Sequence, residues 1–277
     1  MDITFHKMHG LGNDFVLLDC RASAFTLSAQ QIKALGNRRT GVGFDQLLVL
    51  EQSSQAGIDA RYRIFNQDGS AAEHCGNGIR CVAAYLHARL TVSTDTITVE
   101  IDGRRFKLFV QSNGEIRVDM GAPIFAPAQI PTTFERRATK YSLNVLGTDY
   151  ELGAVSMGNP HAVFLVDDVA NFRVAELGQE MQRSNFFPNQ VNAGFMQIND
   201  EKNIDLRVWE RGAGETMACG TGACAAVVVG KLWGMLADTV KVHLPGGVLT
   251  IEWAGADNDK VWMTGPASYV FEGRITL

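Results

Sequence analysis

A repeat that spans nearly the whole chain is the feature that most constrains the fold. A Cys-Gly-x-Gly segment begins at Cys75 and again at Cys219, which is 219 − 75 = 144 positions later, and each copy runs into small and apolar residues. Other matched pairs occur in the same order at similar offsets: Gly12-Asn13 with Gly158-Asn159, Gly103 with Gly247, and Gly121-Ala122-Pro123 with Thr264-Gly265-Pro266. Four matched pairs in one order indicate an internal duplication.

The duplication predicts an α/β (α+β) fold, rich in strands, made of two pseudo-symmetric domains. In each half, runs of β-favouring residues flank a helix of small apolar residues, so a sheet should wrap around a buried central helix. The first domain is expected to span residues 1–120 and the second residues 121–266, with the tail 267–277 completing the first. Shorter helices are expected at residues 28–37 and 174–183. An active site is expected in the cleft between the domains.

Composition and charge exclude several classes of protein. The 277 residues are 46% hydrophobic and 20% charged, which is ordinary for a globular chain, and the formal net charge is −5. Lys and Arg are scattered, so no nucleic-acid partner is expected. Apolar runs stop short of the length that crosses a membrane, and the N-terminus lacks a signal-peptide pattern. These observations predict a cytoplasmic protein without a membrane partner.

The five cysteines do not form a disulfide framework or a metal site. Their number is odd, and a cytosolic setting would keep them reduced. The spacings within the two cysteine segments do not match the short Cys-x2-Cys pairs of zinc sites, so no metal is expected. Cys20, Cys81 and Cys224 are interpreted as small buried hydrophobes.

Cys75 and Cys219 each precede a helix, where unpaired backbone N–H groups and the helix dipole stabilise anions and lower the pKa of a thiol. Facing one another across the cleft, one could remove a proton from a carbon while the other delivers a proton to its opposite face. The helix ends would stabilise charge on the adjoining carboxylate. Such a pair would titrate as a coupled unit, one thiolate and one thiol. No dinucleotide or P-loop motif is present, so no cofactor is expected.

Three other functions use the same residues. The two cysteines could form a redox dithiol, although such pairs usually occur as Cys-x-x-Cys. A single nucleophilic cysteine could act with His161 as base, which leaves the repeated cysteine unexplained. A non-catalytic module could bind anions at both helix ends, but it would not require cysteine there.

Several segments resemble the diaminopimelate epimerase family. They are Met8 to Phe15, Asn66 to Ser70, Cys75 to Cys81, Gly158 to His161, and Trp209 to Gly222. The resemblance implies an isomerase that interconverts LL- and meso-2,6-diaminopimelate in lysine and cell-wall precursor synthesis, without pyridoxal phosphate. The related proline racemase group typically has histidine where this chain has Asn77, so it resembles the chain less.

The resemblance also implies roles for individual residues. Cys75 and Cys219 would be the acid and base, and His161 and Glu210 would tune their ionisation. The substrate would be held by backbone N–H groups and polar side chains of Asn13, Gln46, Asn66, Gly76, Asn77, Asn159, Asn192, Glu210, Arg211, Gly220 and Thr221. A homodimer is implied, with an aromatic residue at Phe271 in the contact.

Some of these residues have simpler interpretations. Asn13 and Asn159 follow glycines and could be only turn residues. Glu73 and Glu215 precede the helices and could only cap them. Residues 268–275 could form an ordinary buried edge strand. His161 stands where the other repeat has Phe15, and this polar replacement favours a functional role.

Overall fold

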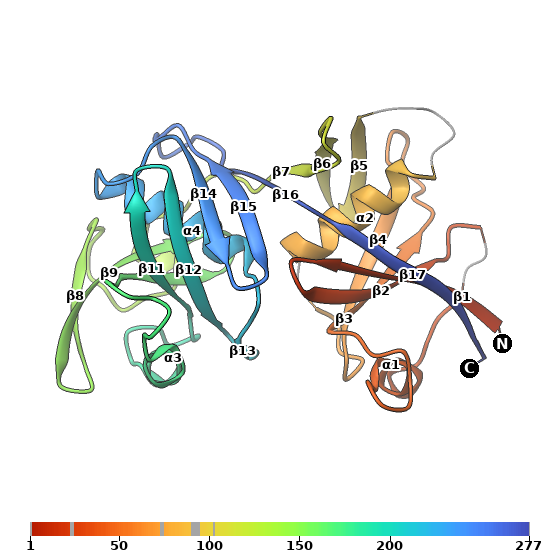
Figure 1. Ribbon diagram of the computed structural model, residues 1–277, viewed down its shortest axis with the longest axis horizontal. Helices are drawn as coiled ribbons and strands as arrows, with labels where there is room; N and C mark the ends of the chain where they lie inside the picture. The colour runs from red at the N-terminus through yellow and green to blue at the C-terminus, as the bar shows by residue number, and fades with distance from the viewer. Residues whose placement is uncertain (1, 23–24, 73–74, 90–94, 102, 277) are drawn as a thin grey trace. The chain divides into compact units, whose positions relative to one another are not determined.

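The computed structural model describes residues 2–22, 25–72, 75–89, 95–101 and 103–276. Its contacts divide the chain into two compact units, one of Met1–Val118 with Gly265–Leu277 and one of Asp119–Thr264. Both units combine a sheet with two α-helices, and Figure 1 traces the two sets of elements. The predicted strand-rich α+β fold in two pseudo-repeat domains is confirmed.

In the first unit, the strands follow the order β17-β1-β2-β3-β4-β5-β6-β7. Pairs β2–β3 and β4–β5 are parallel and the others antiparallel. The strand bounds are β1 (Asp2–Gly10), β2 (Asn13–Asp19), β3 (Gln46–Glu51), β4 (Ala60–Asn66), β5 (Thr96–Ile101), β6 (Arg104–Val110), β7 (Ile116–Asp119) and β17 (Ser268–Thr276). The last strand, β17, therefore lies beside the first, as Figure 1 shows.

The second unit repeats this pattern. Strands β9, β10, β11, β12, β14, β15 and β16 pair in the same alternation as β1 to β7, and β8 pairs with β9 as β17 pairs with β1. The bounds are β8 (Tyr141–Val145), β9 (Thr148–Ser156), β10 (Pro160–Leu165), β11 (Asn192–Asp200), β12 (Asn203–Glu210), β13 (Gly214–Glu215), β14 (Thr239–Leu244), β15 (Gly247–Glu252) and β16 (Trp262–Gly265). A short 3₁₀ turn, η1 (Pro127–Gln129), precedes them.

Each unit is built around one buried helix, α2 (Gly76–His87) in the first and α4 (Gly220–Leu232) in the second. Nearly every residue of α4 is buried, because small and apolar side chains surround its axis. The helix lies so close to β9 that a Cβ atom added at Gly153 would come within 2.4 Å of a Val229 methyl group. Glycine is therefore required there by space alone.

The two shorter helices lie where the sequence predicts them. They are α1 (Ala29–Gly36) and α3 (Val174–Arg183). Ser28 caps α1 through a capping box with Gln31, since the Ser28 hydroxyl accepts from Gln31 N and the Gln31 side chain accepts from Ser28 N. Among the described residues, no helix combines the length and apolarity that a bilayer crossing needs.

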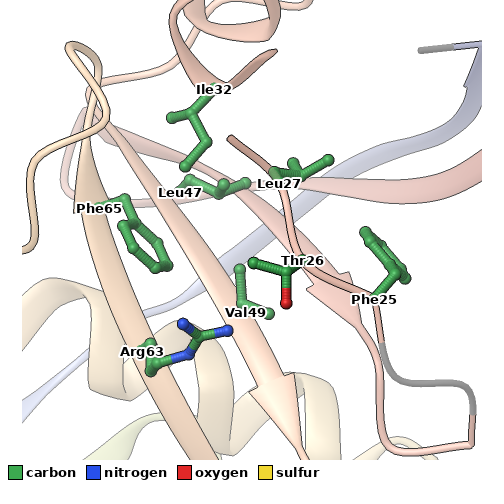
Figure 2. A pocket seen from close by; sticks show the side chains of 8 residues that line it. All are labelled: Phe25, Thr26, Leu27, Ile32, Leu47, Val49, Arg63 and Phe65. Atoms are coloured by element: carbon green, nitrogen blue, oxygen red, sulfur yellow. The ribbon is translucent and has the colours of Figure 1, made fainter. Parts of the chain in front are cut away.

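A small cavity of about 10 Å³, room for about one water molecule, lies in the core next to α1. Figure 2 shows its lining: Phe25, Thr26, Leu27, Ile32, Leu47, Val49, Arg63 and Phe65. Ile32, Leu47 and Val49 belong to the apolar cluster that holds α1 to the sheet. The described residues that line this cavity include none of those expected to hold a substrate, so it is part of the packing.

Candidate active site

In the first unit, the ends of three neighbouring strands place polar side chains before α2. Phe15 of β2 is in register with Gln46 of β3, which is in register with Asn66 of β4. The Gln46 amide donates to Asn66 Oδ1 at 3.3 Å, and Asn66 Nδ2 donates to the Ser70 hydroxyl at 3.1 Å. Asn13 begins β2. Three amide side chains thus line the strand ends.

Cys75 is the N-cap residue of α2 and has an extended backbone, φ −114° and ψ 117°. Its thiol is partly exposed and lies 3.6 Å from Asn13 Oδ1. The same oxygen accepts from Asn77 Nδ2 at 3.3 Å. The helix begins at Gly76, so the backbone N–H groups of its first turn and the positive end of the helix dipole lie beside the thiol. This arrangement suits an anion held next to Cys75.

The second unit has the same framework with different side chains. His161 of β10 is in register with Asn192 of β11, and Ala193 is in register with Trp209 of β12, which places Asn192 beside Glu210. Asn159, Asn192 and Glu210 therefore occupy the repeat positions of Asn13, Gln46 and Asn66. Where the first unit has the amide of Asn66, the second unit has the carboxylic acid of Glu210.

Cys219 is the N-cap residue of α4, φ −118° and ψ 108°, and is only 4% exposed. Its thiol donates to Glu210 Oε2 at 3.0 Å and lies 3.6 Å from the Thr221 hydroxyl. The other carboxylate oxygen of Glu210 accepts from the Thr216 hydroxyl at 2.5 Å. Burial raises the pKa of the Cys219 thiol well above its usual range, and the charge of Glu210 and its hydrogen bond raise it further. We therefore expect the Cys219 thiol to keep its proton at neutral pH.

His161 is buried and contacts Asn159 rather than a thiol. Its Nε2 lies 2.9 Å from Asn159 Oδ1, and since a carbonyl oxygen only accepts, Nε2 is assigned the hydrogen. Asn159 Nδ2 in turn donates to the Thr221 hydroxyl at 3.3 Å. Burial, with a smaller effect of the Arg211 charge, lowers the pKa of His161 to about 3. The imidazole is therefore neutral near pH 7.

Asn192 orients the backbone that follows β12. It is 3% exposed, its Nδ2 donates to Pro160 O at 3.0 Å, and its Oδ1 accepts from Arg211 N at 2.9 Å. The Arg211 guanidinium also lies 3.5 Å from Asn189 O. Asn192 thus connects the Arg211 backbone to β10. The guanidinium of Arg211 is of the kind that can donate two parallel hydrogen bonds to a carboxylate.

The chain matches the family model of diaminopimelate epimerase over residues 5–126 and 153–270. The chain belongs to the diaminopimelate epimerase family. Diaminopimelate epimerases of Thioalkalivibrio sulfidiphilus and Stutzerimonas stutzeri are 52% and 51% identical to it, with the whole of each chain covered. Because the family model and the relatives that match over the full length agree, the protein is an isomerase.

Solved structures share the fold at much lower identity. A protein described as a predicted epimerase from Pseudomonas aeruginosa matches with a TM-score of 0.70 and 16% identity, over 99% of both chains. A hydroxyproline epimerase from Agrobacterium vitis matches with a TM-score of 0.69 and 13% identity, over 99% of this chain and 92% of that one. At such identities the likeness shows the fold alone.

The structure corrects the interpretation of Glu215 and shows two further polar residues near the cysteines. Glu215 does not cap α4, because it lies in β13 and its carboxylate accepts two hydrogen bonds from Arg207. Glu73 lies outside the described residues. Sequence reasoning missed Thr216, which fixes the second oxygen of Glu210, and Arg80, which contacts Asn77. Both residues lie within the motifs around the two cysteines, but no local sequence signal distinguished them.

Proposed function

We propose that the protein interconverts LL- and meso-2,6-diaminopimelate by proton transfer at one α-carbon, with Cys75 and Cys219 as base and acid. Family membership supports the substrate. The observation that carries the mechanism is that each repeat presents a cysteine as the N-cap of its buried helix, one against neutral amides and one against a carboxylate. A duplicated binding module would have no use for this difference.

In the forward direction, a thiolate removes the α-hydrogen as a proton and becomes a thiol. The electron pair of the C–H bond stays on the α-carbon and spreads into the adjoining carboxylate. The second thiol then gives its proton to the opposite face and becomes a thiolate. The configuration is inverted, the two cysteines have exchanged protonation states, and no cofactor is consumed.

Backbone N–H groups at the starts of α2 and α4 are available to stabilise the negative charge that develops on the substrate carboxylate. Gly76 and Asn77 are the first two residues of α2, and Gly220 and Thr221 are the first two of α4. The backbone N–H groups of a first helical turn point out of the helix end, so they can donate to the carboxylate as its charge increases. Since these donors are fixed by the helices, they need little reorganisation during the reaction.

The distal end of diaminopimelate is itself an amino acid and requires both acceptors and donors. We assign it, with the remaining substrate contacts, to the strand-end side chains Asn13, Gln46, Asn66, Asn159, Asn192, Glu210 and Arg211. Arg211 would pair with the distal carboxylate through two N–H groups. Glu210 can also take the proton of Cys219 through the 3.0 Å contact, which would prepare that cysteine to act as base in the reverse direction.

This activity would supply meso-diaminopimelate for lysine and peptidoglycan precursor synthesis, pathways of the cytoplasm. We also propose that the protein acts as a homodimer through β17. Tyr269, Val270 and Phe271 are 44%, 53% and 47% exposed, so β17 is not an ordinary buried edge strand. Exposed aromatic side chains on a terminal strand favour a protein contact.

The test is incubation of the purified protein with LL- or meso-diaminopimelate in deuterium oxide. Deuterium should enter the α-carbon as the stereoisomers equilibrate. Cys75→Ala and Cys219→Ala should each abolish epimerisation, whereas Cys224→Ala, a buried position inside α4, should retain activity. Full activity in either of the first two variants would overturn the two-base mechanism, and absence of exchange in the wild type would overturn the substrate.

A further inference from the structure

Four charged side chains form a network where strands β2 and β3 begin. Asp14, in β2, accepts from Lys7 Nζ and from Arg38 Nη1 and Nη2, the last two at 3.0 and 2.6 Å. Arg38 Nη2 also donates to Asp45 Oδ1 at 2.6 Å. Burial alone would raise the pKa of Asp14, but hydrogen bonds from Arg38 and Lys7 lower it to about 2. Asp14 is therefore ionised at neutral pH, and the Arg38 guanidinium joins two carboxylates.

The two carboxylates also accept from each other's backbone. Asp45 N donates to Asp14 Oδ1 at 3.1 Å, and Asp14 N donates to Asp45 Oδ2 at 3.1 Å. A backbone hydrogen bond from Asp45 N to Asp14 O, 2.9 Å long, lies beside them. Each carboxylate adjoins an expected substrate contact, since Asn13 precedes Asp14 and Gln46 follows Asp45. The network therefore fixes the backbone from which both of these side chains project.

Asp45 also determines which way the Asn13 amide faces. Asp45 Oδ2 lies 3.1 Å from Asn13 Nδ2, and because an ionised carboxylate only accepts, the NH2 group of Asn13 must face it. The amide oxygen then points to the start of α2, where it accepts from Asn77 Nδ2 at 3.3 Å and lies 3.6 Å from Cys75 Sγ. A carbonyl oxygen has two lone pairs, so Asn13 Oδ1 can accept from a ligand as well as from Asn77.

The positions that match the two carboxylates are neutral in the second unit. They are Pro160 and Val191. The matching asparagine, Asn159, contacts the Thr221 hydroxyl at 3.3 Å and His161 Nε2 at 2.9 Å. A hydroxyl both donates and accepts, and the tautomer of a neutral imidazole decides whether a nitrogen donates or accepts, so neither partner forces one orientation of the amide. In the first unit, by contrast, an acceptor-only partner imposes the orientation.

We propose that Asp45 is a positioning residue for the reaction: its carboxylate, held by Arg38, turns the Asn13 amide so that Asn13 offers an oxygen to the substrate. At neutral pH, diaminopimelate donates hydrogen bonds through its two ammonium groups, so Asn13 Oδ1 accepts from one of them. The proposal rests on the proposed function, because it names the group that Asn13 recognises in that substrate. It also gives the charge network at the starts of β2 and β3 a role in substrate recognition.

The experiment is a double-mutant cycle of Asn13→Ala, Asp45→Asn and the double variant, with KM and kcat measured on LL-diaminopimelate. An amide at position 45 cannot accept through both of its ends, so either Arg38 or Asn13 loses its acceptor. Asp45→Asn should raise KM about tenfold, the effect of losing one hydrogen bond to a charged group, while kcat changes less. In the Asn13→Ala background, the same change should raise KM less than about twofold, because no amide remains to be oriented.

Asp19→Asn is the matched control. Asp19 also lies in β2 and pairs with an arginine, Arg21, at 2.7 Å, but it is at the opposite end of the strand from Asn13. The control should leave KM within about twofold of the wild type, as expected for an ion pair away from the site. An unchanged KM in Asp45→Asn would overturn the proposal, as would effects of Asn13→Ala and Asp45→Asn that simply multiply in the double variant.

A second measurement needs no substrate. The Asn13 NH2 group and the Asp14 N–H donate to the same oxygen of Asp45, so NMR of the ligand-free wild type should show a strong nuclear Overhauser effect between them. Asn13→Ala assigns the NH2 signal, and Asp45→Asn should weaken the effect. Its absence in the wild type would overturn the proposal even if Asp45→Asn does not fold. This outcome is separate from failure of the deuterium test, which would concern the substrate.

Discussion

The Cys219 thiol lies 3.0 Å from Glu210 Oε2, whereas Cys75, its counterpart in the other repeat, lies 3.6 Å from the amide oxygen of Asn13. A carboxylate can take the proton that a thiol donates, and an amide oxygen cannot. The two repeats therefore share a backbone framework and differ in the group that faces the thiol.

Glu210→Gln should separate the carboxylate's role in proton transfer from its role in packing. Glutamine keeps the volume and an oxygen that can accept from Thr216, but it cannot take the Cys219 proton. We expect kcat to fall by about 10²–10⁴-fold, the range of general acid–base groups, with little change in thermal stability. Glu215→Gln, on the neighbouring strand, is the control and should stay within about twofold. Steady-state kinetics with wild-type kcat in Glu210→Gln would contradict the assignment.

The repeat supplies a matched pair of glycines for testing how accurately Cys219 is placed. A Cβ at Gly222 would lie 3.2 Å from both Cys219 Cβ and Sγ and 3.1 Å from a Val208 methyl group. A Cβ at the repeat position, Gly78, would lie 3.6 Å from Cys75 Cβ, an ordinary contact. Gly222→Ala should therefore displace its thiol and reduce kcat about tenfold or more, and Gly78→Ala only a few-fold. Equal effects on kcat would show that thiol placement is not limiting.

Much of the fold was predictable because both halves of the sequence show the same order of elements. The helix–strand order follows from the periodicity of each half, α1 follows from its capping residue Ser28, and α3 occupies the corresponding place in the second half. The cysteines were identifiable because glycines and a small apolar helix follow each of them. Family resemblance identified most of the polar residues, since Asn and Gln at strand ends carry no local signal that separates a ligand contact from a turn.

Other parts were not predictable from local pattern. The hairpin of β8 and β9 turns at Leu146, φ 53°, and Gly147, φ 78°. Leucine rarely adopts positive φ, so its presence does not predict a left-handed turn. The contact between Thr216 and Glu210 depends on the β12–β13 pairing. The burial of Arg80, which is 0% exposed in α2, has no signal in the neighbouring sequence. These features are set by tertiary packing rather than by neighbours in the sequence.

His161 should make the folded state less stable in acid. Its folded pKa is about 3, below its ordinary value of 6.5, so the unfolded chain binds the proton that the folded state excludes. Stability from this group is therefore complete above about pH 6.5 and is lost as the pH falls toward about 3, at about 1.4 kcal/mol per pH unit. Urea unfolding of the wild type and of His161→Gln at several pH values isolates the effect. Parallel stability curves would show that His161 takes up its proton in the folded state.

The same burial predicts how activity responds to pH. Since His161 stays neutral, no protonation step of this imidazole should appear in kcat/KM between about pH 5 and pH 8. His161→Gln should therefore leave the acid limb of the profile at the same pH, even where the rate itself falls. An acid limb that disappears in the variant would assign the limb to His161.

The proposed dimer can be tested on the two faces of β17. Phe271 pairs with Lys7 and Tyr269 with Met8, with a register shift between the two pairs, so the two aromatic side chains lie on opposite faces of β17. The Phe271 ring packs edge-on against Phe5 with centroids 6.0 Å apart, which holds an apolar surface in place while leaving 47% of the residue exposed. Phe271→Ala removes most of this surface and should shift the dimer toward monomer at micromolar concentration, with lower activity. Val270→Ala, at a residue of similar exposure, is the control and should leave the assembly unchanged.

Light scattering, combined with kinetics, measures the assembly and the activity of each variant. A wild-type protein that is fully active as a monomer would exclude a dimer requirement. Equal dissociation in both variants would exclude a specific contact at Phe271.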